Sequence, residues 1–230
     1  MTLERIDYAD GAVALTGWLA RPVGTPRGAI VIWPTIMNVN APIERRAQML
    51  ARAGFLALIA DFYGTSVTDF AHARDLADAL RADVDAYRRR IGAGVAALRA
   101  LAGGLTLSAI GWCMGGQAAL EAARAGEDLA LVASFHGILS TDRAATAIAS
   151  RVFISHGDAD PLVPRAQVLA FWDEMDAAGA NWHFHSYAGV KHGFTDPGSD
   201  ARGMPAIGYD ASADCQSWAA LNGLLDEIYP

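Results

Sequence analysis

The chain has 230 residues, 53% of them hydrophobic, and a formal net charge of −7 at pH 7. This size and composition suit one α/β domain with a sizeable core, so we expect a single domain over residues 1–230. The negative charge argues against nucleic acid or an anionic membrane surface as a partner. Residues 1–20 lack the basic start and apolar core of a signal peptide, and no uncharged apolar run approaches the roughly 20 residues of a membrane span. We therefore expect a cytoplasmic protein, either a monomer or a homodimer.

Apolar runs of strand length alternate with helical patterns along the chain. Strands are expected at residues 13–20, 29–33, 55–60, 105–110, 129–135, 151–155 and 181–187, with residues 6–8 as a candidate partner of the first. Helices are expected at residues 42–53, 69–101, 117–124, 164–178 and 211–228. This alternation predicts a mostly parallel central sheet with helices on both faces, an α/β/α three-layer sandwich.

Two stretches of the chain have less regular patterns. Residues 69–101 carry an apolar stripe at helical spacing, but Gly92 and Gly94 interrupt the helix-forming residues, and we expect the helix to break near them. Residues 196–209 are rich in glycine and proline, which predicts a long loop that follows the last expected strand.

The sequence GWCMGG at residues 111–116 stands between an expected strand and an expected helix. It has the G-x-nucleophile-x-G form of a strand-to-helix elbow, with Cys113 at the nucleophile position. Such a turn leaves almost no room for side chains at Gly111 and Gly115. It exposes the tip of Cys113 at the N-terminus of a helix, where the helix dipole favours a thiolate over a thiol. The elbow therefore predicts an activated cysteine.

Two further motifs follow the elbow in chain order, each directly after an expected strand. Asp160 begins the sequence DPLVP, and His192 begins the sequence HGF. Loops at the carboxyl ends of parallel strands converge, so Cys113, Asp160 and His192 are expected to meet. A thiolate attacks a carbonyl carbon, an imidazole carries the proton, and a carboxylate holds the imidazole in the correct tautomer. Asp158 is a local rival to Asp160.

A tetrahedral intermediate at Cys113 needs hydrogen-bond donors for its oxyanion. The backbone N–H of Met114, at the start of the following helix, is one expected donor. The second is expected from the loop after the strand that ends at Trp33, where Ile36 is the best candidate. His136 directly follows another expected strand, and it either lines the same pocket or has a simple role in its loop.

Together with the sequence DFYG at residues 61–64, these motifs resemble the dienelactone hydrolase (carboxymethylenebutenolidase-like) family of α/β-hydrolases. The resemblance spans nearly the whole chain, and the cysteine-containing elbow is its most specific part. It implies an α/β-hydrolase fold. It also implies an enzyme that cleaves a small carboxylic ester or lactone through a Cys-Asp-His triad and an acyl-thioester intermediate. Tyr63 and Phe194, within the matching motifs, are candidate substrate contacts.

Two positions depart from the family pattern. In the best-studied members, a glutamate after the strand that here ends at Trp33 helps to activate the cysteine; Thr35 holds this position and cannot act as a base, so it is only a candidate substrate contact. Those members also carry an arginine, four residues after the triad histidine, that binds the substrate carboxylate; here the residue is Asp196. An acidic side chain repels a carboxylate, so we expect a substrate other than dienelactone itself. Arg74 and Arg81 are candidates for a second anchoring arginine.

We expect neither a metal nor a cofactor. His183 and His185 share one face of an expected strand, at a spacing that can chelate a metal. No third ligand cluster accompanies them in the sequence, so a solvated strand face is the better interpretation.

Three other functions remain open at this point. A thioesterase or another acyl-transfer enzyme would use the same triad. A catalytically weak binding or sensing protein would keep the fold without turnover, and the threonine at residue 35 favours this alternative. A redox role for Cys113 would need a resolving cysteine, and the second cysteine of the chain, Cys215, is distant in sequence.

Overall fold

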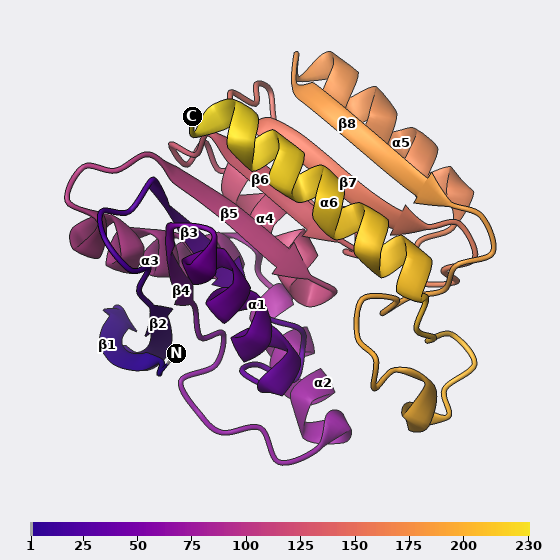
Figure 1. The fold of residues 1–230 in the computed structure, drawn as a ribbon. Helices are drawn as coiled ribbons and strands as arrows, with labels where there is room; N and C mark the ends of the chain where they lie inside the picture. Colours follow the sequence, from indigo (N-terminus) through magenta and orange to yellow (C-terminus); the bar gives the residue numbers. More distant parts are fainter. Residues whose placement is uncertain (1) are drawn as a thin grey trace.

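In residues 2–230, which this computed structural model describes, one eight-stranded sheet forms the centre of the fold (Figure 1). The strands are β1 (Glu4–Asp10), β2 (Val13–Ala20), β3 (Gly28–Trp33), β4 (Phe55–Ile59), β5 (Leu107–Trp112), β6 (Leu131–Phe135), β7 (Arg151–Gly157) and β8 (Asn181–Tyr187). The helices are α1 (Ala41–Arg52), α2 (Phe70–Arg81), α3 (Val84–Ala102), α4 (Met114–Arg124), α5 (Arg165–Ala177), α6 (Ala211–Ile228) and the short 3₁₀ helix η1 (Asp200–Arg202).

The strand order is β1-β2-β4-β3-β5-β6-β7-β8. Strand β2 pairs antiparallel with β1 and with β4, whereas every pairing from β4 to β8 is parallel. Helices α1 and α6 pack on one face of the sheet, and α3, α4 and α5 pack on the other (Figure 1). The predicted three-layer α/β/α sandwich with a mostly parallel sheet is therefore confirmed.

The central strands are buried on both faces because helices cover both sides of the sheet. All six residues of β3 and all six of β5 are buried, whereas the exposure of β8, at the edge, largely alternates. Aromatic pairs pack at the carboxyl ends of the central strands. Trp33 stacks on Phe62 with ring centroids 5.2 Å apart, and Trp112 stacks on Phe135 at 5.1 Å. These pairs support the loops that follow the strands.

The helix expected over residues 69–101 is two helices, α2 and α3, and the break expected near Gly92 and Gly94 is wrong. The chain breaks instead at Asp83, whose carboxylate accepts hydrogen bonds from two N–H groups in the first turn of α3, at 2.9 and 3.3 Å. Gly94 lies inside α3, where a Cβ would come within 2.6 Å of the Trp33 ring. This glycine lets α3 pack closely against β3 instead of ending the helix.

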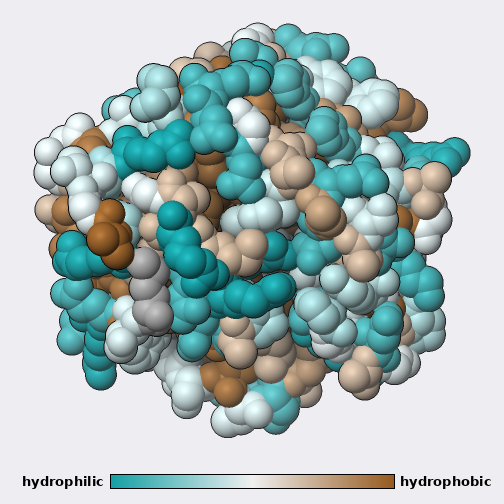
Figure 2. All heavy atoms as spheres, viewed as in Figure 1, coloured by the Kyte–Doolittle hydropathy of each residue, from teal (hydrophilic) through white to brown (hydrophobic). Residues whose placement is uncertain are grey.

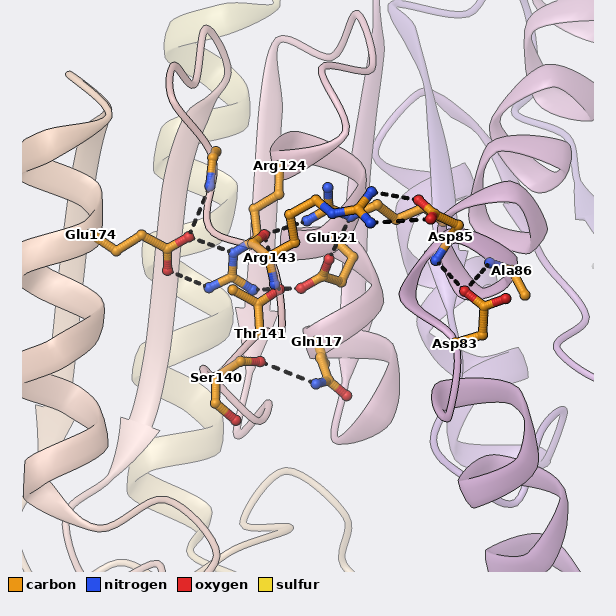
Figure 3. A network of polar contacts seen from close by, with 12 residues as sticks. Asp83, Asp85, Ala86, Gln117, Glu121, Arg124, Ser140, Thr141, Arg143 and Glu174 are labelled. Atoms are coloured by element: carbon orange, nitrogen blue, oxygen red, sulfur yellow. Dashed lines mark hydrogen bonds and ion pairs between the residues drawn. The ribbon is translucent and has the colours of Figure 1, made fainter.

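A network of buried ion pairs holds α4 to its neighbours (Figure 3). Glu121 of α4 accepts hydrogen bonds from Arg88 of α3 at 2.8 Å and from Arg124 of its own helix at 2.9 Å. Arg124 also donates to both carboxylate oxygens of Glu174 in α5, at 2.8 and 2.6 Å. Glu121 and Arg124 are buried, so the loss of one partner would leave an unpaired buried charge. The network therefore fixes α4, which begins next to Cys113, relative to α3 and α5.

Because strands β5 to β8 are parallel, the four loops that follow them lie together along one edge of the sheet, the edge formed by the carboxyl ends of the strands. Cys113 follows β5, His136 follows β6, Asp160 lies after β7, and His192 lies after β8. Residues 193–210, which include η1, pass this edge before α6 begins (Figure 1). The fold thus gathers the motifs that the sequence analysis identified.

The face of the molecule in Figure 2 carries hydrophilic residues with hydrophobic ones scattered among them, and no broad hydrophobic area covers that face. The larger apolar side chains gather instead in two clusters, one on each side of the sheet. Among the helices within residues 2–230, none is both long and apolar enough to cross a membrane.

Two glycine-to-alanine changes in helices should have opposite effects on stability. In Gly115→Ala the new Cβ would lie 2.0 Å from the carbonyl oxygen of Trp33, which is backbone, so we expect the free energy of unfolding to fall by about 3 kcal/mol or more. Gly223→Ala, at an exposed position of α6, meets nothing within 4 Å, and we expect a gain of about 0.5–1 kcal/mol. Urea unfolding measures both changes. Similar effects of the two substitutions would contradict the packing described for the start of α4.

Candidate active site

The turn between β5 and α4 holds Cys113 in an uncommon backbone conformation. Its φ angle is 56°, in the left-handed region that favours glycine. A Cβ at Gly111 would lie 1.8 Å from the carbonyl oxygen of Gly115, and a Cβ at Gly115 would lie 2.0 Å from that of Trp33. Contacts this close explain why both positions are glycine. The strand and the helix on either side hold the strained residue in place.

Cys113, His192 and Asp160 form a hydrogen-bonded chain. The Oδ2 atom of Asp160 lies 2.7 Å from Nδ1 of His192, and both side chains are buried. A carboxylate only accepts hydrogen bonds, so Nδ1 carries the hydrogen here and Nε2 is left for the hydrogen bond with Cys113. The rival carboxylate, Asp158, is paired with Arg165 at 2.9 and 2.6 Å. Asp160 is therefore the carboxylate that contacts His192.

The charges of Cys113 and His192 depend on each other. Burial raises the pKa of the Cys113 thiol, but the neighbouring charge of His192 and hydrogen bonds to the sulfur outweigh burial, so this pKa lies below its ordinary value. Burial lowers the pKa of His192, but the thiolate and Asp160 outweigh it and raise that pKa to about 10. Both shifts describe one proton shared by the pair. Both shifts favour the thiolate–imidazolium form of the pair over the neutral form.

Two backbone N–H groups converge on the Cys113 sulfur from different elements. One belongs to Met114 at the start of α4, and the other belongs to Ile36 in the loop after β3. The hydroxyl of Tyr63 donates a hydrogen bond to the carbonyl oxygen of Ile36 at 3.0 Å. In the same loop, the hydroxyl of Thr35 accepts a hydrogen bond from the N–H of Met37 at 3.3 Å. These contacts orient the peptide groups that face the sulfur.

Cys113 opens onto a cavity of about 1010 Å³. Its walls include Cys113, His192, Thr35, Ile36 and His136, all of which the sequence analysis named. They come from the carboxyl ends of β3, β5, β6 and β8. Within residues 2–230, no group of three or more histidine, cysteine, aspartate or glutamate side chains is arranged to hold a metal ion.

Tyr63 and Phe194, named above as candidate substrate contacts, lie behind the cavity wall and are not among the wall residues of the described chain. Tyr63 is buried against Ile36, as its hydrogen bond shows. Phe194 is fully buried and packs edge-to-face on His136, with ring centroids 5.3 Å apart. Their positions correct the sequence interpretation, because both side chains support wall residues and neither faces the cavity.

The cavity wall contains, next to His192, a second histidine, His136. Its φ angle is 41°, its ring meets that of His192 edge-to-face at 5.0 Å, and its Nε2 lies 2.9 Å from Oγ1 of Thr195. Burial first, and then the charge of His192, hold the pKa of His136 well below its usual value. His136 is therefore a neutral imidazole beside His192. The sequence placed it after a strand but gave no sign of this contact.

Two arginines that the sequence analysis missed also line the cavity. Arg46 of α1 forms a buried ion pair with Asp214 of α6, and its guanidinium lies 4.7 Å from the Trp218 ring centroid. Arg202 of η1 forms an ion pair with Asp196. No sequence signal marks either pair, because the partners of Arg46 come from a distant helix and Arg202 lies in an irregular loop. The acidic residue at the family's arginine position thus has a positively charged partner.

The chain is similar to known proteins in both sequence and structure. The sequence pattern of the dienelactone hydrolase family matches residues 15–229. The crystal structure of a dienelactone hydrolase-like promiscuous phosphotriesterase from metagenomic libraries is 34% identical, with a TM-score of 0.94 over 100% of this chain and 99% of that one.

Two curated relatives are also similar. A probable 2-oxo-3-(5-oxofuran-2-ylidene)propanoate lactonase of Bradyrhizobium sp. is 28% identical over 222 residues, 87% of each chain. An uncharacterized protein of Caenorhabditis elegans is 36% identical over 127 residues, 54% of this chain and 80% of the relative. With the family match over nearly the whole chain and the fold described above, the expectation from the motifs is confirmed: the chain belongs to the dienelactone hydrolase family of the α/β-hydrolase superfamily and is an ester-bond hydrolase.

Proposed function

We propose that the enzyme hydrolyses a carboxylic ester or lactone with Cys113 as the nucleophile, His192 as the proton carrier and Asp160 as the carboxylate that orients His192. The observation that supports this proposal is the hydrogen-bonded chain of the three side chains beside a cavity large enough for a substrate. Their order in the sequence and their places after β5, β7 and β8 are typical of a hydrolase triad.

Acylation begins from the thiolate. The sulfur of Cys113 attacks the carbonyl carbon of the ester, and the negative charge moves from sulfur to the carbonyl oxygen. In the resting site the N–H groups of Met114 and Ile36 donate hydrogen bonds to the sulfur. They are close enough to donate to the carbonyl oxygen when the negative charge has moved there. When the intermediate collapses, the C–O bond breaks, and Nε2 of His192 gives its proton to the departing alcohol. The products of this step are an acyl-thioester on Cys113 and a neutral His192.

Deacylation reverses the flow of protons. Neutral His192 takes a proton from water, and the resulting hydroxide attacks the thioester carbon. The C–S bond then breaks, the carboxylic acid leaves, and the thiolate–imidazolium pair is restored. Asp160 accepts the Nδ1 hydrogen throughout and stabilises the imidazolium in both steps. One water is consumed for each ester that is cleaved.

Activation of Cys113 in this chain does not depend on the glutamate that the family pattern carries after β3. Thr35, which holds that position, cannot take up a proton. Its hydroxyl accepts a hydrogen bond from the backbone N–H of Met37. The remaining contributions are the charge of His192, the start of α4 and two N–H groups. These contributions lower the pKa of the thiol without a glutamate at this position.

Phosphotriester hydrolysis is a second candidate activity. It is supported by the similarity to a relative described as a promiscuous phosphotriesterase and by a cavity of about 1010 Å³, which has room for three substituents around phosphorus. The thiolate would attack phosphorus, and His192 would protonate the departing oxygen; water, deprotonated by the neutral His192, would then attack phosphorus and break the P–S bond. Hydrolysis of paraoxon that disappears in Cys113→Ala would support this activity, and a rate equal to that of buffer would exclude it.

Removal of the nucleophile should abolish ester hydrolysis. We expect Cys113→Ala to lower kcat/KM for p-nitrophenyl acetate by at least about 10³-fold, because the covalent route is lost. Cys215→Ser, at an exposed free cysteine, is the matched control and should keep the wild-type rate. Full activity of Cys113→Ala would make the proposal wrong. A wild-type protein that is alkylated readily but turns over no ester, lactone or thioester would indicate a binding or sensing protein.

The reactivity of Cys113 should extend to lower pH than that of an ordinary thiol. Because its pKa is lowered, the thiolate persists as the pH falls below about 8.5, the usual thiol value, and is lost only at lower pH. In a Cys215→Ser background, the midpoint of the iodoacetamide alkylation rate against pH should therefore lie below 8.5. His192→Gln removes the cation but not the burial, so the midpoint should rise. A midpoint that does not move with this substitution would contradict the ion pair.

A further inference from the structure

The cavity at Cys113 ends in a rim of exposed hydrophobic side chains. Phe70, Leu162 and Met204 all line it and are 43%, 48% and 36% exposed. They come from three separate segments: the start of α2, the loop after β7 and the loop after η1. They make up three of the six large hydrophobic side chains that are exposed in residues 2–230, so exposed apolar surface is concentrated at this opening. Such a concentration marks a place where an apolar group binds.

Apolar walls connect the rim to the nucleophile. The aliphatic wall residues are contributed by the loop after β3, by α1, by the loop after β6 and by the segment before α6, and they include Ile36, Met37, Ile43, Ile138, Ala206 and Ile207. A ligand that extends from the sulfur to the rim would touch hydrocarbon along its length. Its burial would therefore be driven by removal of apolar surface from water.

Ion pairs neutralise most of the charge on the cavity wall. Arg81 pairs with Asp78 at 2.8 Å, and Arg202 pairs with Asp196. Arg46 is likewise paired with a buried aspartate of α6. Arg74, which is exposed on α2, is the one wall arginine of the described chain for which no carboxylate partner is found. The wall segment that follows His192 thus carries a neutral pair where the family pattern has a free arginine.

The cavity is also large for a small lactone. Its volume of about 1010 Å³ lies at the upper end of the roughly 300–1,000 Å³ that ligand sites commonly span. A small ester at Cys113 would leave the walls and the rim in contact with water. An extended apolar group would displace that water, so its binding energy would contribute to kcat/KM.

We infer that the substrate is a neutral ester with an extended apolar chain, which lies along the cavity from Cys113 to the rim formed by Phe70, Leu162 and Met204. The inference rests on ester hydrolysis at Cys113, as proposed above. It adds the substrate class: a medium-length aliphatic ester rather than a small anionic lactone.

Two ester series with increasing chain length test the inference. The first is p-nitrophenyl esters from acetate to decanoate, and the second is alkyl butyrates from methyl to octyl, each below the concentration at which the ester aggregates. We expect kcat/KM to rise in one of the two series by about two- to threefold per methylene, since a fully buried methylene is worth close to fourfold. Rates that stay level or fall with length in both series would overturn the inference.

Substitutions at the rim locate the chain. In the series whose kcat/KM rises with length, Phe70→Ser, Leu162→Ser and Met204→Ser should each lower the ratio of the rate on the eight-carbon ester to the rate on the shortest ester by about three- to tenfold, because part of the bound chain loses its apolar contact. Leu169→Ser is the matched control, since this leucine is 56% exposed on α5 and is not a wall residue. It should leave the ratio unchanged. An equal effect of all four substitutions would overturn the inference.

An anionic ester is the competing occupant. The mono-p-nitrophenyl ester of suberic acid has the same chain length as the octanoate but ends in a carboxylate. We expect the neutral ester to be favoured by at least about tenfold, because desolvation of a carboxylate in an apolar cavity is costly. Preference for the anionic ester, lost in Arg74→Gln, would overturn the inference. Hydrolysis that persists in Cys113→Ala across the series would instead count against the proposed function itself.

Discussion

Strand β5 and helix α4 meet so closely at Cys113 that side chains are excluded from two positions of the turn. A Cβ at Gly115 would lie 2.0 Å from the carbonyl oxygen of Trp33, so the start of α4 lies directly against the end of β3 as well as β5. This contact brings the N–H of Met114 and the N–H of Ile36 to the same sulfur. A negative charge at that point meets two donors and the positive end of a helix that are already in place. The chemistry of the site thus depends on a steric constraint.

His192 and Asp160 are buried and Cys113 is half-buried, so each charge in the site needs a partner. Asp160 and Cys113 contact different nitrogens of the His192 ring, and a negative charge on either of them favours the imidazolium form of His192. A second cation beside His192 would compete with it for the same partners. His136 avoids this competition, because burial and the charge of His192 hold its pKa well below the usual value. The wall beside His192 therefore stays neutral, in agreement with the mostly paired arginines of the cavity.

The sequence predicts those features that local chemistry determines. The glycines around Cys113 indicate the elbow, and the alternation of apolar runs indicates the parallel sheet, which together explain why motifs more than 70 residues apart meet. Individual side-chain contacts outside these motifs were not predictable. In the sequence Gly94 looks like a helix breaker, whereas in the structure it makes room for the Trp33 ring inside an unbroken helix. The sequence suggests that Tyr63 faces the pocket, but in the structure its hydroxyl donates a hydrogen bond to a backbone carbonyl. Asp196 looks like an unpaired acidic residue in the sequence, but in the structure it forms an ion pair with Arg202.

The central claim is that the ester is attacked by Cys113 and held there as a thioester. Acid quenching during turnover of a saturating p-nitrophenyl ester, followed by digestion and mass spectrometry, locates the acyl group directly. We expect an acyl adduct on the peptide that contains Cys113, removed by hydroxylamine and absent from Cys113→Ala. An acyl group on any other residue, or a quenched enzyme that carries none while the ester is turning over, would contradict it.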